Sequence, residues 1–179
     1  MPNWRVSIVY DSDALPGFGR GWGFSLFLSS NHTNILFDCG WDGFLLRENL
    51  RRLNISFSDL DAVVISHSHW DHLSGIQNVL RHPLLSSNFK VIVPAGFPPR
   101  LIEEMEKWAV VKEAKRKEKI FPGVYSTGPL GSLKEQSLVL AGKKGGAVIT
   151  GCGHAGIFDI LRRGNEICDP LWLIGGLHD

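Results

Sequence analysis

The chain of 179 residues is long enough for one domain with a sizeable core, and its 44% hydrophobic and 21% charged residues are typical of a globular protein. With 19 basic and 18 acidic residues the net charge is +1, which gives no reason to expect nucleic acid or an anionic membrane as a partner. The sequence shows neither a signal-peptide core nor a membrane span, and its three scattered cysteines do not suggest a disulfide framework. We therefore expect a single domain over residues 1–179, in the cytoplasm and with reduced thiols.

Hydrophobic periodicity predicts intermixed strands and helices in the first half of the chain. The expected elements are strands over 4–11, 24–28, 35–37 and 61–66, and helices over 44–53 and 73–81. Residues 12–21 hold Pro16 and three glycines, so we expect a loop there, lying beside the functional site. The run from Ala62 to Ile65 is short, apolar and rich in β-branched residues, which is typical of a strand buried on both faces.

The second half continues the same pattern. The expected elements are strands over 89–93, 124–127, 137–141, 147–150 and 171–174, and helices over 100–108 and 157–163. Residues 112–119 mix both charge signs, so we expect a solvated surface segment there rather than a binding patch. Residues 171–174 are all apolar and predict a buried strand. Hairpins in both halves favour an α/β (α+β) fold in which helices cover β-sheets.

Ligand-type side chains are concentrated directly after the predicted strand 61–66. The segment Ser66-His67-Ser68-His69-Trp70-Asp71-His72 holds four of them within six positions. In an extended chain His67 and His69 point the same way, because side chains alternate with a period of two, so both imidazoles can reach one metal ion. Asp71 and His72 follow in the turn and can point to a neighbouring position. Imidazole and carboxylate groups bind zinc and similar ions, so the sequence predicts a metal site here.

This segment resembles the His-x-His-x-Asp-His signature of the metallo-β-lactamase superfamily, and residues 35–40 and 62–66 resemble the strands that precede it in that family. The resemblance implies a four-layer αββα sandwich. A narrower resemblance is to a subgroup of short microbial members named dihydropterin–ribofuranosylaminobenzene phosphate synthases. It rests on three segments: Glu135-Gln136-Ser137-Leu138, Gly151-Cys152-Gly153-His154-Ala155-Gly156 and Gly175-Gly176-Leu177-His178.

The resemblance implies roles for these residues. A first metal would be held by His67, His69 and His154, and a second by Asp71, His72 and His178. The ions would be divalent, with zinc favoured and iron or manganese also compatible.

Two further residues receive roles by the same resemblance. Many members have an aspartate that bridges two metals, and the corresponding place here holds Gly151-Cys152. Cys152 is therefore either a thiolate ligand or a small buried residue, and one-metal function is a reasonable alternative. Asp38 is expected to support the ligand loop through hydrogen bonds, without touching metal.

The expected activity is hydrolysis of a small metabolite ester or phosphoester by a metal-activated water, with Asp71 orienting or deprotonating the nucleophile. One alternative is the subgroup's transfer reaction, which joins a pterin diphosphate to a ribofuranosylaminobenzene phosphate. A second alternative is a non-catalytic protein that binds metal or ligand. We expect a small-molecule substrate, no nucleic acid or membrane partner, and a pocket that a second copy of the chain could complete as a homo-oligomer.

Overall fold

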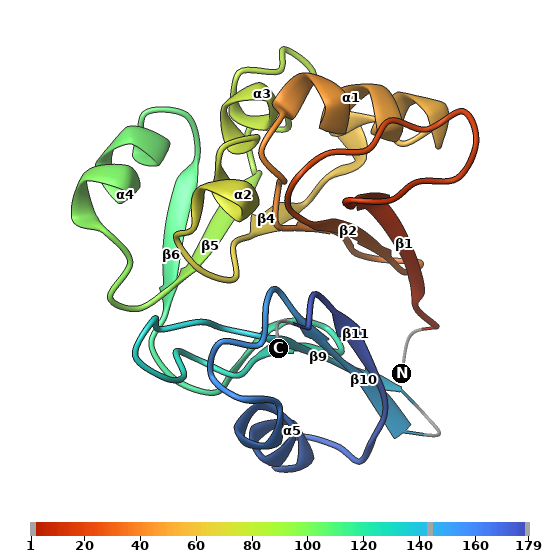
Figure 1. Cartoon of the computed structure of the whole chain (residues 1–179). Coiled ribbons are helices and arrows are strands. Elements are labelled where there is room, and N and C mark those ends of the chain that lie inside the picture. The colour runs from red at the N-terminus through yellow and green to blue at the C-terminus, as the bar shows by residue number, and fades with distance from the viewer. Residues whose placement is uncertain (1–2, 143–144, 178–179) are drawn as a thin grey trace.

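The computed structural model describes residues 3–142 and 145–177. Two β-sheets lie face to face, and helices cover the outer face of each sheet (Figure 1). The predicted four-layer αββα sandwich is therefore confirmed. Among the described residues, no helix has the length and apolar character that crossing a membrane requires.

The first sheet has the strand order β1-β2-β3-β4-β5-β6. Its strands are β1 (Arg5–Tyr10), β2 (Ser25–Ser29), β3 (Asn34–Phe37), β4 (Ala62–Val64), β5 (Lys90–Pro94) and β6 (Val110–Ala114). The first three strands form an antiparallel meander, and β3 to β6 run parallel to one another. Because the carboxyl ends of β3 and β4 meet at one edge of the sheet, the segments after Phe37 and Val64 lie side by side there.

The second sheet has the order β11-β10-β9-β8-β7. Its strands are β7 (Glu118–Phe121), β8 (Val124–Ser126), β9 (Leu138–Gly142), β10 (Gly145–Thr150) and β11 (Pro170–Gly175). Pairing is antiparallel except between β10 and β11. The turn after β10 therefore opens at the same end of the sheet as the end of β11, since these two strands are parallel.

Five α-helices and one 3-10 helix complete the described fold. They are α1 (Gly43–Arg52), the 3-10 helix (Phe57–Asp59), α2 (Trp70–Leu73), α3 (Ile76–Leu80), α4 (Pro99–Glu106) and α5 (Ile157–Asn165). Helices α1 and α3 cover the first sheet, α4 contacts β6, and α5 covers the second sheet (Figure 1). The Asp42 side chain caps α1 by accepting hydrogen bonds from the backbone N–H groups of Phe44 and Leu45.

The period of two in the central strands divides the apolar core into layers. In β3, Ile35 and Phe37 pack between the two sheets, whereas Leu36 faces the helices outside the first sheet. In β9, Leu138 and Leu140 likewise face the space between the sheets, while the side chain of the intervening residue packs against α5. Strand β4 is fully buried on both faces, as its β-branched sequence predicts.

The predicted helix over residues 73–81 is wrong, because two short helices replace it. The helix is interrupted at Ser74 and Gly75, where Gly75 N–H donates to Gly40 O at 3.1 Å. Gly75 lies so close to the first sheet that an added Cβ would be 2.1 Å from the carbonyl oxygen of Cys39. This close backbone contact, which sequence periodicity does not register, separates α2 from α3.

The structure also changes the interpretation of two surface segments. Residues 112–119 are mostly exposed, as predicted, but they contain the end of β6 and the start of β7, joined by a Lys112–Glu118 ion pair of 2.8 Å. Residues 171–174 form a strand, but the prediction that it is buried is wrong. Leu171 and Trp172 remain 61% and 68% exposed, because β11 is an edge strand that α5 covers only in part.

Candidate metal centre

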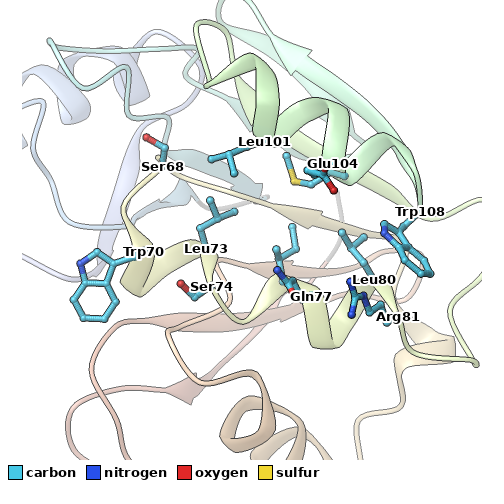
Figure 2. A pocket seen from close by; sticks show the side chains of 12 residues that line it. Ser68, Trp70, Leu73, Ser74, Gln77, Leu80, Arg81, Leu101, Glu104 and Trp108 are labelled. Carbon is cyan, nitrogen blue, oxygen red and sulfur yellow. The ribbon is translucent and has the colours of Figure 1, made fainter.

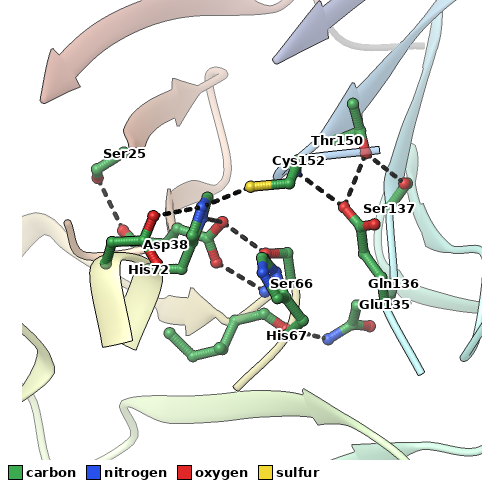
Figure 3. A network of polar contacts seen from close by, with 12 residues as sticks. Ser25, Asp38, Ser66, His67, His72, Glu135, Gln136, Ser137, Thr150 and Cys152 are labelled. Atoms are coloured by element: carbon green, nitrogen blue, oxygen red, sulfur yellow. Dashed lines mark hydrogen bonds and ion pairs between the residues drawn. The ribbon is translucent and has the colours of Figure 1, made fainter. Parts of the chain in front are cut away.

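The predicted ligand segment lies at the carboxyl end of β4, between the two sheets (Figure 3). The segment holds His67, which is buried, and His69, which is half-buried and immediately precedes α2. From the second sheet, the turn after β10 brings His154 to the same place. The ring centroids of His67 and His69 are 4.5 Å apart, and each is 4.9 Å from that of His154. Three imidazoles from two sheets therefore meet at one point.

The buried carboxylate of Asp38 organises the first-sheet side of this centre. One oxygen accepts from Ser66 N–H at 2.7 Å, and the other accepts from Ser66 Oγ–H and faces His72 Nδ1, each at 2.7 Å. Ser66 Oγ in turn lies 2.8 Å from Nδ1 of His67. With Nδ1 of His72 held by a carboxylate, its Nε2 faces the centre, which is the usual arrangement of a metal-binding histidine.

The Asp38 carboxylate also favours the protonated form of His72. Burial disfavours the imidazolium form, but the negative charge and hydrogen bond of Asp38 outweigh this effect and raise the pKa of His72 to about 10. Asp71 lies on the other side, with a carboxylate oxygen 3.7 Å from His72 Nε2. His72 is thus placed between two carboxylates, so this side of the centre is suited to hold positive charge.

Glu135 and Gln136 organise the second-sheet side. Glu135 Oε1 accepts hydrogen bonds from the backbone N–H groups of Cys152 and Gly153, both at 2.9 Å, and from Thr150 Oγ1 at 3.1 Å (Figure 3). Gln136 joins the two sheets, because its side-chain amide donates to Ile65 O at 2.8 Å. The loop that carries His154 is thereby fixed relative to the segment that carries His67.

The donor set fits a bound metal ion. One ligand atom each from His67, Cys152 and His154 lie within 4.8 Å of one another. Ligand atoms of a tetrahedral zinc site are about 3.4 Å apart when each lies about 2.1 Å from the ion, so small side-chain movements suffice. His154 is exposed, which leaves the centre open to solvent on one side. The group therefore has the chemistry and the spacing of a metal site with room for a further ligand.

Two hollows border the ligand segment on different sides. One, of about 260 Å³, is lined by residues of three loops and of α2: Asp11, Ser12, Trp22, Gly23, Phe24, Asp71, His72, Gly151, Cys152, Gly176 and Leu177. It includes Trp22 from the glycine-rich loop region but not Phe18, which lines a different hollow beside β1 and α1. Residues 12–21 were predicted to lie beside the site, and this holds for Ser12, which lines the hollow together with Trp22, but not for Phe18.

The other hollow is an apolar groove of about 360 Å³ between α4 and the pair α2–α3 (Figure 2). Leu101 from α4 lies opposite Leu73 and Leu80, and Trp70 stands at one end (Figure 2). Trp70 also packs edge-on against Trp41, with ring centroids 5.2 Å apart. None of the three converging histidines lines either hollow, but Asp71, His72 and Cys152 line the hollow of about 260 Å³, which is therefore the one beside the candidate chemistry.

The structure brings together most of the residues that the sequence singled out. His67, His69, Asp71, His72, Cys152 and His154 surround the centre and Asp38 lies behind it, whereas His178 is outside the described residues. Sequence reasoning assigned no role to Glu135, Gln136 or Ser66. The resemblance of residues 135–138 to the subgroup was the available signal for the first two, since a buried Glu-Gln pair needs hydrogen-bonding partners.

Comparisons with known proteins agree with this geometry. Residues 33–131 match the model of the beta-lactamase superfamily domain. An uncharacterized protein of Methanocaldococcus jannaschii is 26% identical, with 97% of this chain and 78% of that protein covered. A second protein of the same organism, 7,8-dihydropterin-6-methyl-4-(beta-D-ribofuranosyl)-aminobenzene-5'-phosphate synthase, is 23% identical, with coverage of 89% and 70%.

Among solved structures, Tm1679, a metal-dependent hydrolase of the beta-lactamase superfamily, superimposes with a TM-score of 0.80 at 25% identity. The match covers 98% of this chain and 77% of that one. An N-acyl homoserine lactone hydrolase with its product at the catalytic metal centre gives a TM-score of 0.63 at 17% identity, covering 98% and 90%, which shows a shared fold. The family model spans more than half of the described chain and contains the whole His67–His72 segment. The chain therefore belongs to the beta-lactamase superfamily, which includes metal-dependent hydrolases.

Proposed function

We propose that this protein is a metal-dependent hydrolase acting on a small metabolite ester or phosphoester. The observation that carries the proposal is the convergence of His67, His69 and His154, contributed by two different sheets, at a point open to solvent. A centre that served only to stabilise the fold would be expected to be closed by a fourth protein ligand. The similarity to metal-dependent hydrolases of the superfamily supports the same reaction class.

The substrate is proposed to enter the hollow lined by Asp71, His72 and Cys152. Its volume of about 260 Å³ lies slightly below the usual range of about 300–1,000 Å³ for ligand pockets, which favours a small molecule. Trp22 and Leu177 give one wall apolar character. The exposed side at His154 then leaves space for the part of the substrate that departs.

Asp71 is the proposed catalytic residue. Its carboxylate lies 3.7 Å from His72 Nε2 and retains 14% exposure, so it is accessible from the hollow. We assign it the task of orienting the attacking water and accepting a proton. When bound, a divalent ion would supply Lewis-acid polarisation and lower the pKa of water toward about 7. His67, His69 and His154 would hold a first ion, and Asp71, His72 and His178 a second; zinc is proposed, with iron or manganese as alternatives.

The first test measures metal content per chain by elemental analysis, together with rates on phosphoester, thioester and lactone substrates. Replacing both His67 and His69 with alanine should remove the metal and lower kcat/KM by at least 100-fold, since a metal site depends on each ligand. His32→Ala is the matched control, because His32 lies in an exposed turn and should change neither quantity. Full activity of the double variant would contradict the proposal, and metal without any activity would favour the binding-protein alternative.

A second candidate function is the transfer reaction named for the synthase relative of M. jannaschii. The similarity to that relative over 89% of this chain favours it. The assay mixes a pterin diphosphate with a ribofuranosylaminobenzene phosphate. It measures the condensed product and the diphosphate that leaves as the product forms. Condensation with no turnover of the ester panel would replace the hydrolase proposal, whereas ester turnover alone would exclude the transferase.

A further inference from the structure

Among the described residues, the two sheets end in four edge strands, β1, β6, β7 and β11. An edge strand has unpaired backbone N–H and C=O groups along one side, and natural proteins often place charged side chains there, which prevent pairing with another chain. Strand β1 carries Arg5, β6 carries Lys112 and Glu113, and β7 carries Glu118 and Lys119. Strand β11, with the sequence Pro-Leu-Trp-Leu-Ile-Gly, carries no charged side chain. It is therefore the one edge of the described sheets without this protection.

Strand β11 is also regular enough to accept a further strand. Its pairing with β10 shifts register only at its start, and from Trp172 to Gly175 each residue pairs in turn with one residue of β10. The side of β11 that faces away from β10 has no strand beside it (Figure 1). Pro170, which has no N–H group, stands at the first position, so the amides that follow it can still donate. The edge thus offers a row of backbone donors and acceptors.

The side chains of β11 leave apolar surface exposed beside this edge. Ile174 packs with the apolar layer between the sheets, and Leu173 packs with the layer under α5. Leu171 and Trp172, near the start of the strand, are largely exposed. Both apolar layers therefore extend to β11 and are not covered beyond it. A strand that pairs with this edge would extend the sheet and bury these side chains at the same time.

We propose that β11 pairs antiparallel with the β11 strand of a second copy of this chain. A twofold axis perpendicular to the sheet at Leu173 places Trp172 of each copy opposite Ile174 of the other, on the face that continues the layer between the sheets. Like charges that face each other across a strand pair are destabilising, and β11 has no charged side chain that would oppose its own copy. The second sheet then runs through both copies without interruption.

The size of this contact determines its expected strength. A single strand pair lies at or below the total of about 1,200 Å² that the smaller stable interfaces bury. The two copies of Trp172 supply much of the area, because a tryptophan side chain buries about 150–250 Å². We therefore expect a reversible dimer whose population increases with protein concentration. The contact does not involve the candidate metal centre, so its failure would leave the hydrolase proposal intact.

Sedimentation velocity of the full chain, from micromolar to hundreds of micromolar concentrations, tests this pairing. The wild-type protein should change from monomer to dimer as its concentration rises. Trp172→Lys puts a charge on each side of the shared edge and removes the largest apolar side chain, so it should lose the dimer throughout this range. The matched control is Leu84→Lys, which should dimerise like the wild type, because Leu84 is also exposed but lies between α3 and β5.

Hydrogen exchange of the wild-type protein tests the same edge without any variant. Between low and high protein concentration the amides of residues 171–175 should gain protection, whereas those of the charged edges β1, β6 and β7 should not. A monomer at every concentration would overturn the proposal, and so would a dimer with unchanged exchange at residues 171–175. Protection of these amides in a monomer would also overturn it, because an extended peptide from another source would then occupy the edge.

Discussion

At the scale of single residues, Asp38 connects most of the polar groups behind the candidate centre. Its side chain is fully buried. Its two oxygens accept two hydrogen bonds from Ser66, and one of them also contacts Nδ1 of His72. A carboxylate without exposure is costly unless such partners compensate for its lost hydration. Asp38 also adopts a φ of 59°, a left-handed conformation that asparagine and aspartate tolerate better than most residues. These two demands make the position sensitive to substitution.

Asp38→Asn should lower the free energy of unfolding of the metal-free protein by about 2–4 kcal/mol. The amide oxygen can still accept from Ser66 N–H, but the NH₂ group cannot accept from Ser66 Oγ or from His72. Asparagine has nearly the size of aspartate and tolerates the same left-handed backbone conformation. The decrease in the free energy of unfolding therefore measures the effect of the missing acceptor. Urea denaturation measures it, and Asp13→Asn, at an exposed position, should change the value by less than about 0.5 kcal/mol. Equal stability of Asp38→Asn and wild type would contradict this account.

Single residues also mark the boundary of what could be predicted from sequence. His67 and His69 were placed together because strand periodicity acts over two positions and because the segment resembles a known signature. The roles of Glu135 and Gln136 depend on partners such as Ile65 and Cys152, which become neighbours only when the two sheets pack. Polar residues that stabilise a site from a distant strand leave no local pattern in the chain. Their interactions therefore had to come from the structure.

At the scale of elements, the positions of strands and helices agreed with the sequence wherever one local force dominated. The apolar run of β4 and the capped, amphipathic α1 are examples, and their predicted ranges agree with the structure to within two residues. The exposure of strand β11 and the break between α2 and α3 were not predicted, because both depend on what lies next to them. A glycine contact such as that of Gly75 is invisible to periodicity, since glycine contributes no side chain.

Gly75→Ala tests whether this contact separates α2 from α3. Its Cβ would lie 2.1 Å from Cys39 O, a backbone atom that cannot move away easily, so we expect the free energy of unfolding to fall by about 2 kcal/mol. Helix propensity alone predicts the opposite sign, a gain of up to about 1 kcal/mol. Urea denaturation therefore distinguishes the two effects. The control is the exposed neighbour Ser74→Ala, which should remain near wild type, and a stabilised Gly75→Ala would show that the contact imposes no constraint.

At the scale of the whole molecule, the candidate centre lies across the boundary between two halves. The segment with His67 follows a strand of the first sheet, and the loop with Cys152 and His154 follows a strand of the second. The halves are already joined by the apolar layer between the sheets and by Gln136, whose backbone N–H donates to Ser66 O at 2.8 Å. A metal ion bound by both halves would add a further connection that exists only in the folded state.

Metal binding should therefore raise the thermal stability of the whole protein. At a free metal concentration of about 100 times Kd, an ion that binds only the folded chain stabilises it by about 2.7 kcal/mol. For a chain of this size that corresponds to an increase in Tm of about 5–10 °C, which scanning calorimetry with zinc and with chelator would measure. His154→Ala, which removes the exposed ligand of the second sheet, should lose most of the increase, whereas His32→Ala should retain it. If His154→Ala kept the full increase, His154 would not join the two halves through the metal.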